Sequence, residues 1–247
     1  MDTPAFPEET APALNEGERL LCTFTAPSRT MADLRRNASW WVPWLLISVA
    51  SIAFSLAVDK KIGWEQIVET QIQNNPRAAA QMEKLPADQR EKITQMQIAI
   101  LKGISYGIPI VMLIVIAVVA AALLGLFNFG FGAKLSFRQL LAVTTYSFLP
   151  GILNTVLMAI VMYSVQPDAF DIRNPVATNL GYLVPSSKLF LKGMLAAIDI
   201  FNLWTILLLA IGVSQLSKVK KGTAFVAILA LFLFYKLVTT GLSSMQG

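Results

Sequence analysis

A carboxylate inside a long apolar run is the first feature of this sequence that could do chemistry. Asp199 lies between Leu189 and Leu216, a stretch in which most residues are hydrophobic. An ionised side chain at the centre of a bilayer costs about 2.5–3.5 kcal/mol or more, so it is expected to have a function or a partner. Lys192, Asp199 and Asn202 fall within one sector of about 80° on a helical wheel. This stripe predicts either a site for a transported ion or solute, or a contact that locks two helices together.

A second charge lies at a matching depth in the next apolar run. Asp199 is 17 residues before Leu216, and Lys236 is 14 residues after Gly222. At about 1.5 Å per residue, both lie roughly 21–26 Å from the loop that joins the two runs. A short loop makes the two helices antiparallel neighbours. We therefore predict an ion pair between Asp199 and Lys236.

Small and polar residues follow one another along an earlier apolar run. Thr144, Ser147, Gly151 and Asn154 recur at spacings of three and four, and Pro150 removes one helical hydrogen bond. The pattern is typical of a seam between packed helices, and a solute path past a broken helix is the alternative. The candidate intramembrane polar cluster consists of Asp199, Asn202, Lys236, Asn154 and Ser147.

The sequence lacks the residues that most cofactors and metals need. It has no histidine, and Cys22 is its only cysteine. This excludes a zinc ribbon, a haem site, an iron–sulfur cluster and a disulfide within the chain. No phosphate-binding loop or nucleophile motif is present. We predict no enzymatic activity, no catalytic residue, no cofactor, no metal and no nucleic-acid partner.

The elements that must position these residues are membrane-spanning helices. Of 247 residues, 55% are hydrophobic and only 14% are charged, whereas a soluble domain carries about 25% charged residues. A helix of about 20 apolar residues crosses the hydrocarbon. The sequence predicts an all-α, polytopic membrane helical bundle with five transmembrane helices, plus interfacial and loop helices. The predicted spans are about 40–58, 104–127, 140–165, 189–216 and 224–242.

The remaining segments complete the predicted domain organisation. Residues 1–27 read as a disordered acidic N-terminal tail, and residues 28–38 as an interfacial amphipathic helix with Met31 and Leu34 facing lipid. Residues 39–247 form the membrane domain, in which 59–103 is an extramembrane helical segment. Two short loops are basic and free of acids, and Arg29, Arg35 and Arg36 precede the first span. The positive-inside rule therefore predicts a cytoplasmic N-terminus in a multi-pass cell-membrane protein.

Several segments together resemble the Yip1 family, especially its bacterial members. The strongest is the run from Ile198 to Trp204, with Asp199, Phe201 and Trp204, followed by Gly212. Further matches are Asn174-Pro175 with Leu180-Gly181, the run from Leu135 to Leu141, Tyr146 with Leu149-Pro150, and the approach from Pro27 to Arg36 followed by Trp40, Trp41 and Pro43. The family-like motif residues are Asn174, Pro175, Gly181, Asp199, Phe201, Trp204 and Gly212.

This resemblance implies a five-helix integral membrane domain without enzymatic activity, here in a bacterial cytoplasmic membrane. Eukaryotic relatives bind Rab-type GTPases, but this chain lacks the Asp-Leu-Tyr-Gly-Pro segment expected of them, so a Rab-type GTPase is a doubtful partner. The leading hypothesis is a protein that organises the bilayer or scaffolds a protein partner, with a homo-oligomer as one form. A small-solute or ion permease that uses Asp199 and an accessory subunit of a membrane complex are the alternatives.

Overall fold

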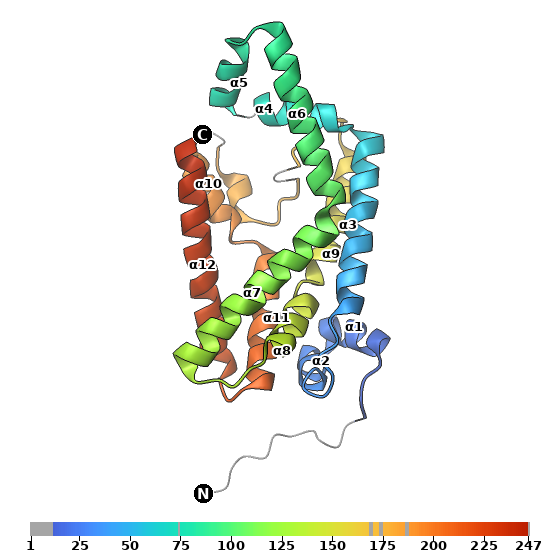
Figure 1. Ribbon diagram of the computed structural model, residues 1–247, viewed down its shortest axis with the longest axis vertical. Coiled ribbons are helices and arrows are strands. Elements are labelled where there is room, and N and C mark those ends of the chain that lie inside the picture. The colour runs from blue at the N-terminus through green and yellow to red at the C-terminus, as the bar shows by residue number, and fades with distance from the viewer. Residues whose placement is uncertain (1–11, 74, 168–169, 173–174, 186–187, 247) are drawn as a thin grey trace, which may run out of the picture.

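The computed structural model describes residues 12–73, 75–167, 170–172, 175–185 and 188–246, and these residues are almost entirely helical (Figure 1). The predicted all-α class is confirmed. An isolated antiparallel β-bridge between Asn179 and Asp199 is the one extended pairing in the described part of the chain. Asn174, a residue of the predicted motif, lies outside the described residues.

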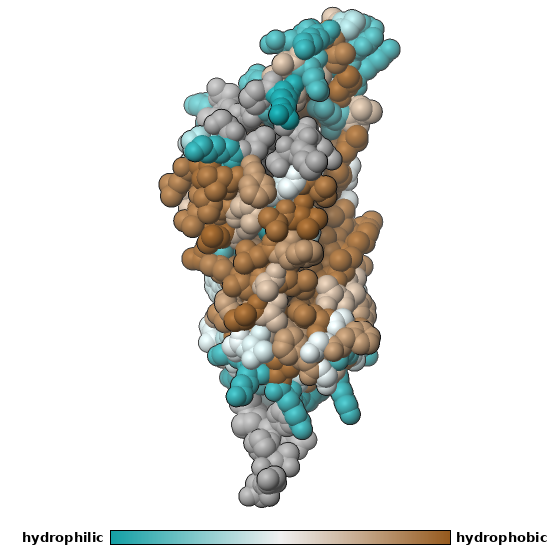
Figure 2. All heavy atoms as spheres, turned by 90° about the vertical axis from the view of Figure 1, so that its left-hand side faces the viewer, coloured by the Kyte–Doolittle hydropathy of each residue, from teal (hydrophilic) through white to brown (hydrophobic). Residues whose placement is uncertain are grey.

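Four helical segments of the described residues are long and apolar enough to cross a membrane. They are α3 (Trp41–Lys61), α7 (Ile108–Phe131), the segment Phe137–Ser164, and α12 (Lys221–Gln246), of which Lys221–Ser243 is apolar. A shorter apolar helix, α11 (Ile200–Leu216), accompanies them. Figure 2 shows a broad hydrophobic belt between two hydrophilic ends, as expected of a polytopic membrane bundle.

The third and fourth predicted spans are both interrupted. Residues 137–164 form α8 (Phe137–Ser147) and α9 (Pro150–Ser164), because Pro150 starts a new helix at its first position. The predicted continuous span 189–216 is wrong: it divides into α10 (Leu189–Ala196) and α11, which begins after Asp199. At 17 residues, α11 alone measures about 26 Å, which is less than the thickness of a typical hydrocarbon core.

Two short helices precede the first span. Within the predicted disordered tail, Glu16–Thr25 forms helix α1, and Pro27–Asp33 forms α2, which ends earlier than the predicted helix 28–38. The expectation that Met31 and Leu34 face lipid is wrong, since both are fully buried in the main core. They fill the space beside α11 because α2 packs on that helix.

The core that holds the bundle together surrounds α8. Six consecutive α8 residues, from Ala142 to Ser147, are buried, and α7 and α11 pack on this helix. Ser136 and Gln139 form a capping box that starts α8, while Gly132 ends α7 with a φ of 65°. Positive φ favours glycine, so the turn between α7 and α8 is encoded locally.

The described residues of the segment 59–103 are mostly helical, and they project from the end of the bundle opposite α1 and α2 (Figure 1). The segment comprises α4 (Trp64–Gln73), α5 (Pro76–Glu83) and most of α6 (Ala87–Tyr106). We call these three helices the arm. A second, smaller core that includes Trp64 and Ile67 joins the arm to α3 and α9.

Candidate functional site

Asp199 is the N-cap of α11. Its Oδ1 accepts hydrogen bonds from the backbone amides of Phe201 at 2.8 Å and Asn202 at 3.3 Å. Its Oδ2 accepts a 2.5 Å hydrogen bond from the Thr178 hydroxyl. The residue is 8% exposed. It therefore satisfies amides that every helix leaves unpaired at its start, in a position that also favours negative charge.

Asn202 binds the end of α10, the helix that precedes the break. Its Nδ2 donates to the carbonyl of Ala197, the C-cap residue of α10, at 3.3 Å. The extended backbone on either side of Asp199 pairs with residues 178–180. The Leu180 amide donates to the carbonyl of Ile198, and the Ile200 amide donates to the carbonyl of Thr178. Asp199 and Asn202 thus together allow a helix to stop and restart within an apolar region.

The predicted ion pair between Asp199 and Lys236 is not formed. The Asp199 carboxylate is directed to Thr178 and to the start of α11, while Lys236 Nζ lies 6.0 Å from the centroid of the Phe232 ring on its own helix. Ion pairs are instead made elsewhere, by Arg19 with Glu16 and Asp33 and by Lys102 with Asp59. The prediction assumed one straight helix from 189 to 216, and the break at Asp199 removes that assumption.

The rest of the predicted polar cluster is dispersed over α8 and α9. Ser147 is fully buried on α8 and has no hydrogen-bond partner for its hydroxyl, whereas Asn154 is half-buried on α9. Pro150 separates the two helices. Within the cluster, the described hydrogen bonds therefore connect Asp199 with Asn202, and both residues act on helix ends.

Replacing Asp199 separates a capping role from a role for charge. Asparagine is as good an N-cap as aspartate, so Asp199→Asn is expected to keep the thermal stability of the purified protein. Asp199→Ala is expected to lower the free energy of unfolding by about 0.5–2 kcal/mol. Thermal unfolding in detergent micelles measures both. A loss in Asp199→Asn equal to that in Asp199→Ala would show that the negative charge itself is required.

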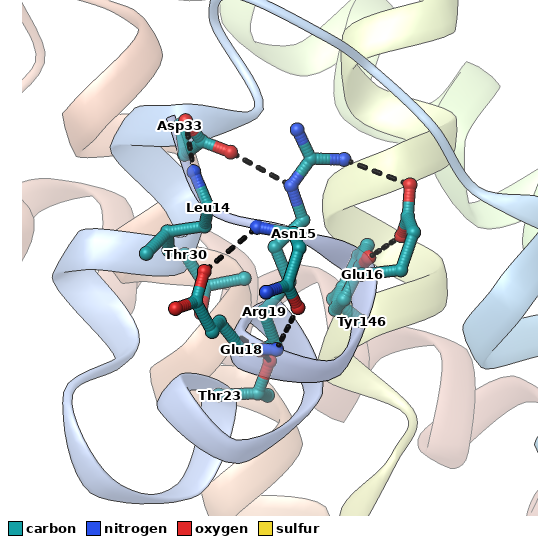
Figure 3. Close-up of polar contacts among 9 residues, drawn as sticks. All are labelled: Leu14, Asn15, Glu16, Glu18, Arg19, Thr23, Thr30, Asp33 and Tyr146. Atoms are coloured by element: carbon teal, nitrogen blue, oxygen red, sulfur yellow. Dashed lines mark hydrogen bonds and ion pairs between the residues drawn. The ribbon is translucent and has the colours of Figure 1, made fainter. Parts of the chain in front are cut away.

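A second polar site, which sequence reasoning missed, fixes the N-terminal helices to the bundle (Figure 3). We call Glu16, Arg19, Asp33 and Tyr146 the N-terminal clamp. Arg19 Nε donates to Asp33 Oδ2 at 2.7 Å, and Arg19 Nη1 donates to Glu16 Oε1 at 3.0 Å. The Tyr146 hydroxyl of α8 donates to Glu16 Oε2 at 2.8 Å. Hydrogen bonds and charge pairs thus link α1, α2 and α8.

The clamp is buried, which makes its charges interdependent. Arg19 is 3% exposed and Asp33 is 7% exposed. Burial by itself lowers the pKa of Arg19, but the hydrogen bond to Asp33 and the nearby carboxylates outweigh it and raise that pKa. Thr23 and Thr30 also direct their hydroxyls to the carbonyl of Arg19. The guanidinium is therefore charged and fixed in one place.

One local signal for the clamp was present in the sequence. Asn15 caps α1 by accepting from Glu18 N, and the Glu18 side chain accepts from Asn15 N. An asparagine followed three residues later by glutamate is the spacing of a capping box. That spacing predicts the start of α1, although it does not predict the contact with Tyr146.

Two glycines of the family-like motif lie where segments of the chain pack very closely. A Cβ at Gly212 would lie 2.3 Å from Val143 of α8, and a Cβ at Gly181 would lie 2.6 Å from the backbone oxygen of Lys192. Trp204 makes an edge-to-face contact with Phe24 of α1, with centroids 5.8 Å apart. Phe201 donates its amide to Asp199, and Pro175 lies in an irregular segment.

The sequence of this chain matches a known family of proteins. No curated protein and no solved structure matches the chain. The sequence model of the Yip1 domain matches residues 21–241, which include α11, the arm, most of α12 and the second half of α1. The match covers most of the chain and agrees with the multi-pass helical architecture. This protein therefore belongs to the Yip1 domain family of integral membrane proteins.

Proposed function

We propose that this protein is a non-enzymatic membrane component that organises the bilayer or scaffolds partner proteins, rather than a permease. The observation that carries the proposal is that its buried ionisable groups bind other parts of the same chain. Asp199 caps α11, and Arg19 and Asp33 bind each other in the N-terminal clamp. A transport carboxylate has to exchange its ligands with a solute, whereas these groups hold the protein's own helices in place.

Family membership supports the non-enzymatic part of the proposal, because Yip1-family proteins are generally non-enzymatic proteins of membrane trafficking. The proposed setting is a bacterial cytoplasmic membrane with the N-terminus in the cytoplasm. Arg35, Lys134, Lys218 and Lys220 all gather at the end of the bundle that carries the N-terminal helices. Basic loops of this kind favour the cytoplasmic side.

The arm offers a surface for a protein partner on the opposite side of the membrane. None of the described α6 side chains is fully buried, although one face of the helix packs toward α4. Met96 and Ile100, four residues apart on the helix, are 57% and 54% exposed. Apolar side chains at this spacing form a stripe on one face, and such stripes are typical anchors in protein interfaces.

Cross-linking in intact membranes, followed by affinity purification and mass spectrometry, tests the scaffold proposal. The full-length protein is expected to capture a defined partner, and Met96→Gln/Ile100→Gln is expected to lose most of that product. The control Gln95→Ala/Gln97→Ala changes two exposed polar residues of the same helix and is expected to retain it.

Two outcomes contradict the proposal. Cross-linked products that are identical in both double variants and in the unmodified protein would show that the arm does not bind the partner. Solute uptake by proteoliposomes that is abolished by Asp199→Asn would identify a permease, because that variant preserves the cap and removes only the charge.

A further inference from the structure

A cavity of about 680 Å³ opens at the end of the bundle that carries the N-terminal helices. Three parts of the chain that are distant in sequence enclose it. They are the end of α7 with the turn after it, the loop between α11 and α12, and Arg35 after α2. This cavity is separate from the Asp199 cap and from the N-terminal clamp, whose residues do not line it.

The rim of the cavity is cationic. Arg35, Lys134, Lys218 and Lys220 are all exposed lining residues, and no aspartate or glutamate is among the described residues that line it. Arg35 Nη2 donates to the carbonyl of Gln215 at 2.7 Å, which holds the guanidinium at the rim. The first turn of α12, which contributes Thr223, adds the positive partial charge of a helix N-terminus.

The wall of the cavity is apolar. Phe131, Leu216 and Val219 line it beside the cations. The cavity lies where the hydrophobic belt ends in a hydrophilic rim, a boundary that Figure 2 shows at the same end of the molecule. In a membrane this boundary is the level of the lipid headgroups. A small soluble anion would contact only the basic side chains, whereas an amphiphile would contact both the basic rim and the apolar wall.

We propose that this cavity binds the phosphate-bearing headgroup of an anionic phospholipid. The lysines and Arg35 pair with the phosphate, and Phe131, Leu216 and Val219 contact the first methylene groups of the acyl chains. Charge-assisted hydrogen bonds to phosphate are among the stronger polar contacts of proteins. Basic pockets between membrane helices are suited to such headgroups because the low dielectric of the bilayer edge strengthens the attraction.

Native mass spectrometry of the full-length protein in detergent, titrated with phosphatidylglycerol or phosphatidylcholine, tests the proposal. We expect tighter binding of phosphatidylglycerol. Lys134→Gln/Lys218→Gln is expected to raise the apparent Kd for phosphatidylglycerol by roughly 30-fold in total. Each basic residue near the headgroup contributes a factor of about five to six in affinity. Lys134→Arg/Lys218→Arg keeps both charges and is expected to bind like the unmodified protein.

A matched control removes two positive charges elsewhere. Lys84→Gln/Lys92→Gln alters two exposed lysines, one directly after α5 and one in α6, and is expected to leave phosphatidylglycerol binding within about threefold. Equal weakening in the two glutamine variants, no weakening in either, or loss of binding in the arginine variant would overturn the proposal. Displacement of the bound lipid by excess inorganic phosphate would also overturn it, by identifying a site for a free anion.

Discussion

Replacing Arg19 with methionine is expected to destabilise the attachment of the N-terminal helices by about 3–5 kcal/mol, the usual cost of breaking a buried ion pair. Methionine fills a similar volume but leaves Asp33, which is 7% exposed, without its main charged partner. It also removes the hydrogen bond to Glu16, the residue that binds Tyr146. The amides of α1 should therefore exchange hydrogen much faster, by roughly a hundred- to several thousandfold.

Hydrogen exchange followed by mass spectrometry in micelles measures this effect directly. Arg29→Met is the matched control, because Arg29 lies in the same segment and is exposed; its exchange rates should stay unchanged. Arg19→Met/Asp33→Leu is expected to recover much of the protection, since a buried charge pair replaced by apolar residues is often close to neutral. Similar exchange rates in Arg19→Met and Arg29→Met would mean that the clamp does not hold the N-terminal helices.

The second large effect is expected at Gly212, where α8 and α11 approach closely. A Cβ added there would lie 2.3 Å from Val143 Cγ1 and 3.0 Å from Val143 Cγ2. Both residues belong to the buried core, so neither helix can move without disturbing other contacts. Gly212→Ala is expected to destabilise the bundle by about 1–3 kcal/mol through overpacking, which thermal unfolding of the purified protein measures.

Two further variants identify the cause of that loss. Gly125→Ala is the control, because a Cβ at Gly125 of α7 meets nothing within 4 Å; it should be neutral or slightly stabilising. In Gly212→Ala/Val143→Ala the smaller side chain makes room for the new methyl group, and the double variant should be more stable than the sum of the two single changes predicts. Strict additivity of the two changes would contradict the steric account.

Composition and pattern were sufficient for the class of fold. Long apolar runs predict helices that satisfy their own backbone in lipid, and the structure has candidate spanning segments for the first, second, third and fifth predicted spans, of which the third is divided at Pro150. The resemblance carried by the segment around Asp199 and Gly212 agrees with the match to the Yip1 domain. These inferences need only local sequence, because burial in a bilayer acts on each segment separately.

The role of Asp199 required more than local sequence. A helical wheel assumes a continuous helix, and under that assumption the carboxylate faces Lys192 and reaches the depth of Lys236. In the structure α10 ends at Ala196 and a new helix, α11, begins at Ile200. Residues 178–180 pair with the extended backbone between the two helices. Aspartate at the start of an apolar helix is also an N-cap signal, so the sequence was compatible with both roles.

By itself, the sequence determined that this protein is a multi-pass helical membrane protein, since hydrophobicity and helix length are properties of consecutive residues. It also encoded the caps at Asn15 and Ser136, which act over three residues. Only the tertiary structure decided which polar groups meet: Glu16 and Tyr146 are 130 positions apart, and Arg35 and Gln215 are 180 apart. Packing sets such contacts, because they depend on the distance and orientation of whole helices and not on the residues next to them in the chain.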